Sequence, residues 1–264
     1  MKPAVIAPLL LLFCAGQARP PVAAVSPTTE PKAGATKIDY YSMTPEQFFN
    51  RRETQDRYGK GSVNGALLEA AIFQQANIER SRHQLGTFQP SFALNLMARR
   101  HSEEMVKLHY FAHESPTPGK RTLVERLRNV GLANVAAAEN IAVLPAREMG
   151  SGHFIVHYNP DGSESLTDAQ TGKPILYDTY QELAESVLDE WMKSPEHRKN
   201  MLNKEYAYLG VGAARGIYGD NHQDSFFLTQ NFSSAVVPAG EVKAQGELAG
   251  HGQANSSQPA VQRP

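Results

Sequence analysis

The sequence is nearly free of cysteine and close to neutral in charge. Cys14 is the only cysteine among 264 residues, and it lies in a segment that we expect to be removed. The mature protein should therefore have no disulfide, and its fold must rest on a hydrophobic core. The formal net charge of -1 argues against a general polyanion binder, so we expect no nucleic-acid partner. With 20% charged and 41% hydrophobic residues, the composition excludes a wholly disordered chain.

The apolar segment near the N-terminus is too short to cross a membrane. Residues Ala4 to Phe13 follow the basic Lys2 and precede small residues, which is typical of a secretory signal peptide. The alternative, a buried N-terminal helix, finds nothing to pack against in the polar stretch that follows. We predict a signal peptide over residues 1–18 and a secreted, periplasmic or cell-surface protein with no transmembrane segment. We do not expect lipid anchoring at Cys14, because Phe13 is bulky for such a cleavage site.

Hydrophobic periodicity predicts helices in the first part of the central region and strands in the last part. The expected helices cover 64–84, the segment after the N-cap Ser91, the segment from the capping box Thr122/Glu125 to Gly131, the segment after the capping box Thr179/Glu182, and a short stretch after Ser194-Pro195. His101 falls on the apolar face of the second helix, where we expect a structural role. The expected strands are "AENIAV", "YLGVGAAR" and "FFLTQNF". This order predicts an α+β layered fold.

Residues 150–178 are predicted to form an inserted β-hairpin. Turn sequences at 159–162 and at 171–172 separate short apolar runs within this segment. His153 and His157 would share one face of a strand. Such a pair could bind a metal, but we expect a solvated hairpin face instead.

Four titratable residues lie at the ends of predicted elements: His113, Glu139, His197 and Arg198. Glu139 stands alone in an apolar run, where a carboxylate is costly to bury unless it is paired or hydrogen-bonded. It could cap a helix or bind an arginine. His197 begins a short helix, whose dipole disfavours the imidazolium and keeps the ring neutral. Taken singly, His113 could be a loop histidine and His197 a hydrogen bonder at a helix start.

Taken in order, these segments resemble a known family. The series "HYFAHESP", "AENIA", "SPEHRKNML", "LGVG" and "FLTQNF" is similar to the CAP family of cysteine-rich secretory proteins, antigen 5 and plant pathogenesis-related protein 1. The resemblance is closest to the bacterial branch without disulfides. It covers about residues 66–233 and implies a three-layer αβα sandwich with a surface cleft. The chain then divides into a signal peptide (1–18), a flexible linker and lead-in (19–60), a CAP domain (61–236) with an insertion (150–178), and a disordered tail (237–264).

The resemblance also implies a site in the cleft. Family members with a complete site have two histidines and two acidic residues that can hold a divalent cation. His113 matches the first histidine, and Glu139 matches the acid of the family's "GEN" motif, although Ala138 replaces the glycine here. His197, followed by Arg198, matches the second histidine as bacterial members carry it. These matches make His113, His197 and Glu139 candidate ligands of zinc or another divalent metal.

The second acidic residue of the family site has no clear counterpart. Its usual position, three residues after the tryptophan, is Ser194 here. Glu190 or Glu196 could substitute for it. We therefore expect the cleft to be lined by His113, Glu139, Glu196, His197 and Arg198.

Three functions are compatible with this sequence. The first is a binding module whose cleft holds a lipid, glycan or peptide ligand, with or without a metal. The second is a metal-assisted hydrolase of cell-envelope or peptide substrates. The third is a surface adhesion protein that makes contact through the inserted hairpin. We lean against demonstrable catalysis, because no nucleophile is recognisable.

Overall fold

The structure is a computed structural model that describes residues 39–59, 63–147, 152–162, 164–219 and 222–236. The predicted signal peptide, Cys14, residues 19–38 and 60 of the predicted linker and lead-in, and the tail 237–264 lie outside these ranges. Within these ranges, no helix is both long enough and apolar enough to span a bilayer.

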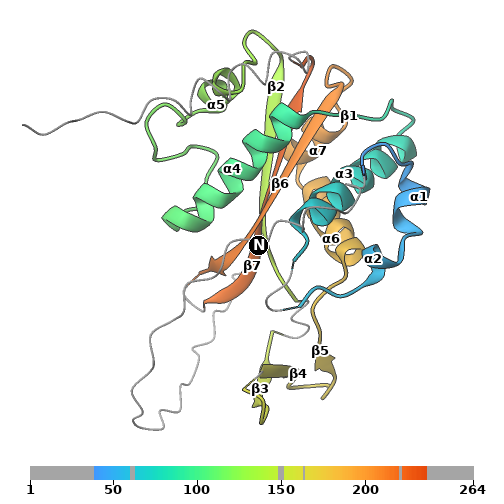
Figure 1. Cartoon of the computed structure of the whole chain (residues 1–264), viewed down its shortest axis with the longest axis vertical. Helices are drawn as coiled ribbons and strands as arrows, with labels where there is room; N and C mark the ends of the chain where they lie inside the picture. Colours follow the sequence, from blue (N-terminus) through green and yellow to red (C-terminus); the bar gives the residue numbers. More distant parts are fainter. Residues whose placement is uncertain (1–38, 60–62, 148–151, 163, 220–221, 237–264) are drawn as a thin grey trace, which may run out of the picture.

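A four-stranded sheet forms the middle layer (Figure 1). Its strands are β2 (Ala137–Pro145), β6 (Tyr208–Tyr218), β7 (Gln223–Ser233) and the short β1 (Gln89–Pro90), in the order β1-β6-β7-β2. The pairs β6–β7 and β7–β2 are antiparallel, whereas β1 runs parallel to β6. The three strands expected from the sequence are therefore the three long strands of this sheet.

Helices cover both faces of the sheet. On one face lie α3 (Gly65–Arg82), α6 (Tyr180–Lys193) and α7 (Pro195–Met201), and on the other lie α4 (Phe92–Leu108) and α5 (Leu123–Asn129). The αβα sandwich predicted from the sequence is thus confirmed. The capping boxes predicted at Thr122/Glu125 and Thr179/Glu182 are both formed. These caps satisfy backbone N–H groups that a helix start leaves without an intrahelical partner.

The two helical layers contact the sheet in different ways. Trp191 of α6 is buried, and its indole nitrogen donates to the carbonyl of Ile141 on β2 at 3.1 Å. On the opposite face, α4 lies directly against the backbone of β6, where Gly210 and Gly212 have no side chains. A Cβ atom at Gly212 would lie 2.1 Å from the backbone nitrogen of Arg99. Glycine is therefore required there by close approach rather than by its conformation.

Part of the segment expected to be a linker and lead-in contributes to the core. Residues 39–59 include α1 (Pro45–Phe49) and α2 (Arg52–Gln55). Phe48 and Tyr58 are buried and belong to the main hydrophobic cluster with α3 and α6. The aromatic residues of this segment follow neither a helical nor a strand period, so this packing was not predicted.

The insertion between β2 and α6 forms a second, smaller sheet. Its strands are β3 (Phe154–Tyr158), β4 (Glu164–Asp168) and β5 (Pro174–Ile175), paired antiparallel in the order β3-β4-β5. The expected hairpin therefore has a third strand. Asp168 organises the turn into β5, because its carboxylate accepts hydrogen bonds from the backbone nitrogens of Gln170 and Thr171. Residues 150, 151 and 163 of the predicted insertion lie outside the described part.

Candidate functional site

The loop between α4 and α5 carries His113, and a single carboxylate from α4 organises this loop. Glu104 accepts hydrogen bonds from the hydroxyls of Ser115 and Thr117, each at 2.6 Å, and from the hydroxyl of Tyr110 at 3.1 Å. Burial alone would raise the pKa of Glu104, but these three donors and Lys120 lower it to about 2. An ionised Glu104 therefore fixes the loop on both sides of His113.

Glu139 lies on β2 with its carboxylate buried, since only 3% of its side chain is exposed. Its Oε1 is 3.0 Å from Nδ1 of His113. Both of its oxygens accept from Nη2 of Arg126, at 2.9 and 2.8 Å. Although burial raises the pKa of Glu139, the hydrogen bond from His113 and the charge of Arg126 more than offset it and bring the pKa below its ordinary value. Glu139 is therefore a buried, ionised and paired carboxylate.

Arg126 holds this carboxylate and the loop together. Its Nη2 binds Glu139, and its Nη1 donates to the backbone carbonyl of His113 at 3.0 Å and to the carbonyls of Lys120 and Arg121, each at 3.2 Å. The Arg126 side chain is only 5% exposed, whereas the His113 side chain is 55% exposed. The loop and β2 thus share one buried cation, which positions an exposed imidazole.

His197 lies at the start of α7, which contacts β2, the strand that carries Glu139. Its backbone carbonyl accepts from the side-chain nitrogen of Asn140 at 3.2 Å, and Asn200 donates to the Asn140 side-chain oxygen at 2.9 Å. Burial lowers the pKa of His197, and the nearby His113 lowers it further. His197 is neutral at pH 7 because its pKa lies below the usual value of about 6.5.

His101 is buried on the inner face of α4, as expected from the helical pattern. Its Nε2 is 3.2 Å from the backbone carbonyl of Ala112 and 3.8 Å from Oε1 of Glu139. Burial lowers the pKa of His101. His101 thus holds the backbone of the His113 loop at Ala112, the residue before His113.

The other residues expected in the cleft are not joined to this cluster. Glu196 and Arg198 are exposed on α7, and in the described part of the chain no hydrogen bond or ion pair links either side chain to His113 or Glu139. Glu190 is also exposed and forms an ion pair with Lys193 at 2.7 Å. No substitute for the family's second acid is therefore brought to the cluster.

The geometry does not suit Glu139 as a metal ligand. Both of its oxygens already bind the guanidinium of Arg126, whose positive charge opposes a second cation. Among the residues that the structure describes, no group of three or more His, Cys, Asp or Glu side chains is arranged to hold a metal ion. The arrangement leaves His113 and His197 as the two candidate ligands, one fewer than a catalytic zinc site usually has. Zinc binding by His113, His197 and Glu139 was expected from the family resemblance. Because both of its oxygens bind Arg126, Glu139 is instead placed to orient the His113 ring, and we expect no tight zinc binding.

Sequence reasoning missed three polar residues around Glu139: Arg126, Asn200 and Asn231. Asn231 is the cross-strand neighbour of Glu139 on β7, and its amide nitrogen lies 3.1 Å from Oε2 when the amide faces the carboxylate. A signal for Arg126 was present, since Arg126 falls on the same helical stripe as the apolar Leu123 and Leu127. A charged residue on a buried stripe implies a buried partner.

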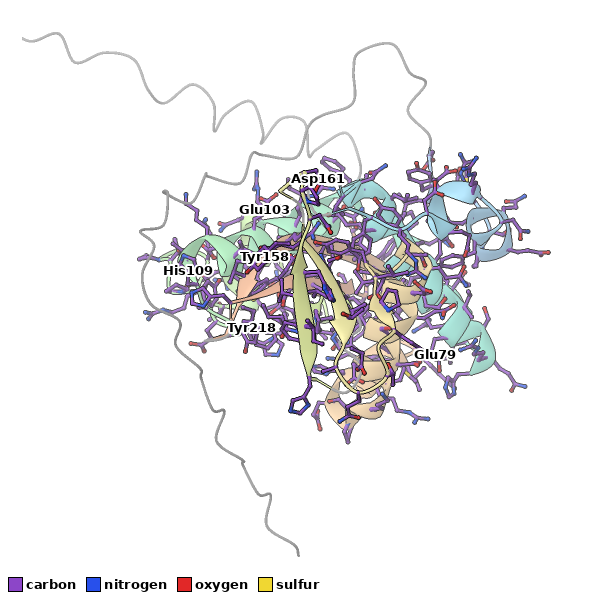
Figure 2. All side chains as sticks on the ribbon, turned by 90° about the horizontal axis from the view of Figure 1, so that it is seen from below. Glu79, Glu103, His109, Tyr158, Asp161 and Tyr218 are labelled. Atoms are coloured by element: carbon purple, nitrogen blue, oxygen red, sulfur yellow. The ribbon has the colours of Figure 1, made fainter. Side chains whose placement is uncertain are left out.

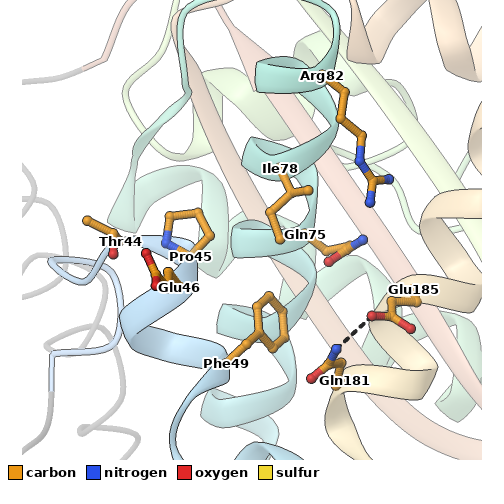
Figure 3. A pocket seen from close by; sticks show the side chains of 9 residues that line it. All are labelled: Thr44, Pro45, Glu46, Phe49, Gln75, Ile78, Arg82, Gln181 and Glu185. Atoms are coloured by element: carbon orange, nitrogen blue, oxygen red, sulfur yellow. Dashed lines mark hydrogen bonds between the residues drawn. The ribbon is translucent and has the colours of Figure 1, made fainter.

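Two surface hollows lie away from this cluster. One, of about 640 Å³, is formed between α1, α3 and α6, and Figure 3 shows its lining, with Phe49 and Ile78 between polar side chains. The other, of about 730 Å³, lies between α6 and the small sheet. Neither is lined by His113, Glu139 or His197, so the chemically distinctive residues do not coincide with these hollows.

Comparison with known proteins decides the family. The family model described as "CAP: Cysteine-rich secretory protein family" matches residues 73–232, which is 160 of 264 residues or about 61% of the chain. The chain belongs to the CAP family. Its CAP domain includes His113, Glu139 and His197 as well as the inserted small sheet.

Several bacterial proteins are similar to this CAP domain. The uncharacterized protein YkwD of Bacillus subtilis is 27% identical over 147 residues, which are 56% of this chain and 42% of YkwD. The uncharacterized membrane protein YlbC of the same organism is 28% identical over 154 residues, covering 58% of this chain and 33% of YlbC. The chain therefore spans less than half the length of these relatives.

Solved structures are also similar to this chain, among them two from bacteria. An extracellular protein with an SCP domain from Bacillus anthracis is 28% identical, with a TM-score of 0.43. The match covers 65% of this chain and 41% of the Bacillus anthracis chain. A cysteine-rich secretory protein from Staphylococcus aureus is 13% identical, with a TM-score of 0.41. The match covers 68% of this chain and 42% of the Staphylococcus aureus chain.

Proposed function

We propose that this protein is a secreted or cell-envelope CAP protein whose cleft at His113 and His197 binds a glycan without transforming it. The observation that carries the proposal is the His113–Glu139 pair. A buried, ionised carboxylate accepts a hydrogen bond from Nδ1 of an exposed imidazole, so Nδ1 carries the ring hydrogen. The other nitrogen, Nε2, is then an acceptor held in a fixed direction at the surface.

A hydroxyl-rich ligand fits this arrangement. The Nε2 atom of His113, on the other side of the ring from the Nδ1 that binds Glu139, can accept from a hydroxyl group, and His197 offers a second ring nitrogen. Phe111, two residues before His113, is 39% exposed and contacts the 42% exposed Tyr218 edge to face, with ring centroids 6.1 Å apart. Exposed aromatic rings combined with fixed polar groups suit a ligand that has both apolar faces and hydroxyls, as sugars have.

The same pair supports a second candidate, a hydrolase in which His113 is a general base. A histidine oriented through Nδ1 by a carboxylate can take a proton from water at Nε2. Among the residues that the structure describes, no serine, threonine or cysteine side chain is hydrogen-bonded to the His113 ring, and Glu139 is too well stabilised as a carboxylate to act as the base itself. Binding therefore needs fewer additional groups than hydrolysis, and we place it first.

The test is calorimetric titration of the purified protein with soluble cell-envelope glycan fragments at pH 7.5. We expect His113→Ala and His197→Ala each to weaken binding by tenfold or more, which corresponds to about 1.4 kcal/mol. His83→Ala is the matched control, because His83 lies at the end of α3 and pairs with Glu79, and it should leave binding unchanged.

Three results would contradict the proposal. Equal affinity of the wild type and both cleft variants would place the ligand elsewhere on the protein. Binding of short peptides or lipid vesicles but not of glycans would change the ligand class. Product formation that disappears in His113→Ala would replace binding by hydrolysis. The secretory part is tested separately, by determining the N-terminus of the protein recovered from the culture medium or envelope fraction.

A further inference from the structure

The inserted small sheet exposes an unusual amount of apolar surface. Four large residues of β3 are more than a third exposed: Phe154 at 45%, Ile155 at 52%, Val156 at 37% and Tyr158 at 78%. Successive side chains of a strand point to opposite faces, so Phe154, Val156 and Tyr158 share one face of the small sheet and Ile155 lies on the other. Scattered single apolar residues are normal on a protein surface, but three on one face of a strand mark an interaction site. The exposed apolar side chains of β3 therefore indicate a surface that binds a partner.

β3 is also the edge strand of its sheet. The strand order is β3-β4-β5, and within the described part of the chain nothing pairs with the outer side of β3. Figure 1 shows the small sheet beside one end of the sandwich, with β3 on the side away from β5. In Figure 2, β3 and β4 run side by side from the turn that carries the labelled Asp161. The outer side of β3 thus offers backbone N–H and C=O groups to another strand.

The register of the sheet creates an apolar row that ends at this edge. Val156 of β3 pairs with Leu166 of β4, which pairs with Ile175 of β5. Side chains at paired positions lie on the same face of a sheet. Ile175 is buried, Leu166 is intermediate, and Val156 is 37% exposed. The row therefore becomes more exposed toward the free edge, where a further strand would extend it.

We propose that β3 pairs antiparallel with β3 of a second copy of this chain, with the two-fold axis at Val156. Val156 then faces its own counterpart, Phe154 faces Tyr158, and Ile155 faces His157 across the axis. The two small sheets become one continuous sheet, and the apolar row runs through it without interruption. Such an interface is isologous, as expected for a two-fold dimer.

Charge and composition favour a second copy over a different partner. The segment Phe154–Tyr158 has no Lys, Arg, Asp or Glu, so pairing with itself opposes no like charges. Four of its five residues are aromatic or β-branched, the types that stabilise cross-strand pairs. The main sheet protects its edges differently, because β1 has two residues including Pro90 and β2 ends at Pro145. Short strands and proline are devices that block edge pairing, and β3 has neither.

Cysteine crosslinking tests both the partner and the register. In a full-length Cys14→Ser background, Val156→Cys places two thiols opposite each other, with Cα atoms about 4.5–5.5 Å apart, within the range of a disulfide. Mild oxidation should convert most of this variant to a disulfide-linked dimer. Ile155→Cys is the matched control, because its two copies would be diagonal neighbours about 7–8 Å apart, which exceeds the usual Cα separation in a disulfide of about 4.4–6.8 Å. It should crosslink far less.

Sedimentation equilibrium over a wide range of protein concentration completes the test. The wild type should sediment as a dimer, and Val156→Lys should sediment as a monomer, because two like charges would meet at the axis. Since Val156 is partly exposed, circular dichroism should show that this variant keeps its fold. A wild type that stays monomeric at every concentration would overturn the proposal, even if it binds lipid vesicles through β3. A dimer that survives Val156→Lys, or that crosslinks equally at both cysteine positions, would also overturn it.

Discussion

Replacing Arg126 by methionine should destabilise the fold by roughly 3–5 kcal/mol at neutral pH, the usual cost of removing one partner of a buried ion pair. The side chains of Arg126 and Glu139 are only 5% and 3% exposed, so water cannot readily replace the lost guanidinium. The substitution also removes the hydrogen bonds to the backbone carbonyls of the His113 loop. Methionine is unbranched and fills a similar volume, so the cost of a cavity should be small.

The loss should depend on pH in a defined direction. Without Arg126, burial raises the pKa of Glu139 above its value in the unfolded chain. An acid whose folded pKa is raised stabilises the native state as pH falls through that pKa. Protonation of the neighbouring His101 at low pH acts in the same direction. The difference in unfolding free energy between wild type and Arg126→Met should therefore be larger at pH 8 than at pH 5.5.

Urea denaturation followed by circular dichroism measures this difference. Arg128→Met is the matched control, because Arg128 is exposed on the same helix, and we expect a change of about 0.5 kcal/mol or less there. In the double variant Arg126→Met/Glu139→Gln, the buried charge of residue 139 is gone, so the part of the stability lost to that unpaired charge should return, whereas the part lost with the carbonyl hydrogen bonds should not. If Arg126→Met and Arg128→Met cost the same, the Arg126–Glu139 pair does not contribute to folding as argued here.

Three further outcomes are expected. Gly212→Ala should cost about 1–3 kcal/mol of unfolding free energy, because the new Cβ would lie 2.1 Å from a backbone nitrogen of α4. The control Gly86→Ala should cost far less, because a Cβ there meets nothing within 4 Å. The pKa of Glu104 falls from 4.5 to about 2 on folding, so Glu104 stabilises the fold above pH 4.5, and this stabilisation is lost as pH falls toward 2. Acid titration monitored by circular dichroism should therefore show a smaller loss of stability in Glu104→Gln than in the wild type. Calorimetric zinc titration should show no tight stoichiometric binding, and such binding abolished in His113→Ala/His197→Ala would refute the argument that Arg126 excludes the metal.

The features that sequence predicted well are local ones. The capping boxes at Thr122 and Thr179 join residues three positions apart, so their geometry depends on few other parts of the chain. The apolar stripe that ends at Trp191 identifies α6 for the same reason. The packing of Phe48 and the third strand of the small sheet depend on distant contacts instead. Neither leaves a periodic pattern in the sequence.

The candidate site also combines a feature that the local sequence predicts with one that depends on distant contacts. The cost of burying Glu139 among apolar neighbours required a partner, and binding to an arginine was one of the two alternatives considered. Arg126 lies only 13 residues away, but the pair forms across the contact between α5 and β2. Its existence therefore depends on how a helix lies against a sheet. The sequence pattern indicated that Glu139 needs a partner, and tertiary packing decides which residue that is.

The identity of that partner changes what the site can do. A carboxylate that faced two histidines without an arginine would complete three ligands for a divalent metal. With Arg126 bound to both of its oxygens, Glu139 is neutralised from one side and can only orient His113 from the other. The positive charge that a metal would have supplied is already present and buried. The exposed groups that remain are imidazole nitrogens and aromatic rings, which can bind the hydroxyl groups and apolar faces of a sugar.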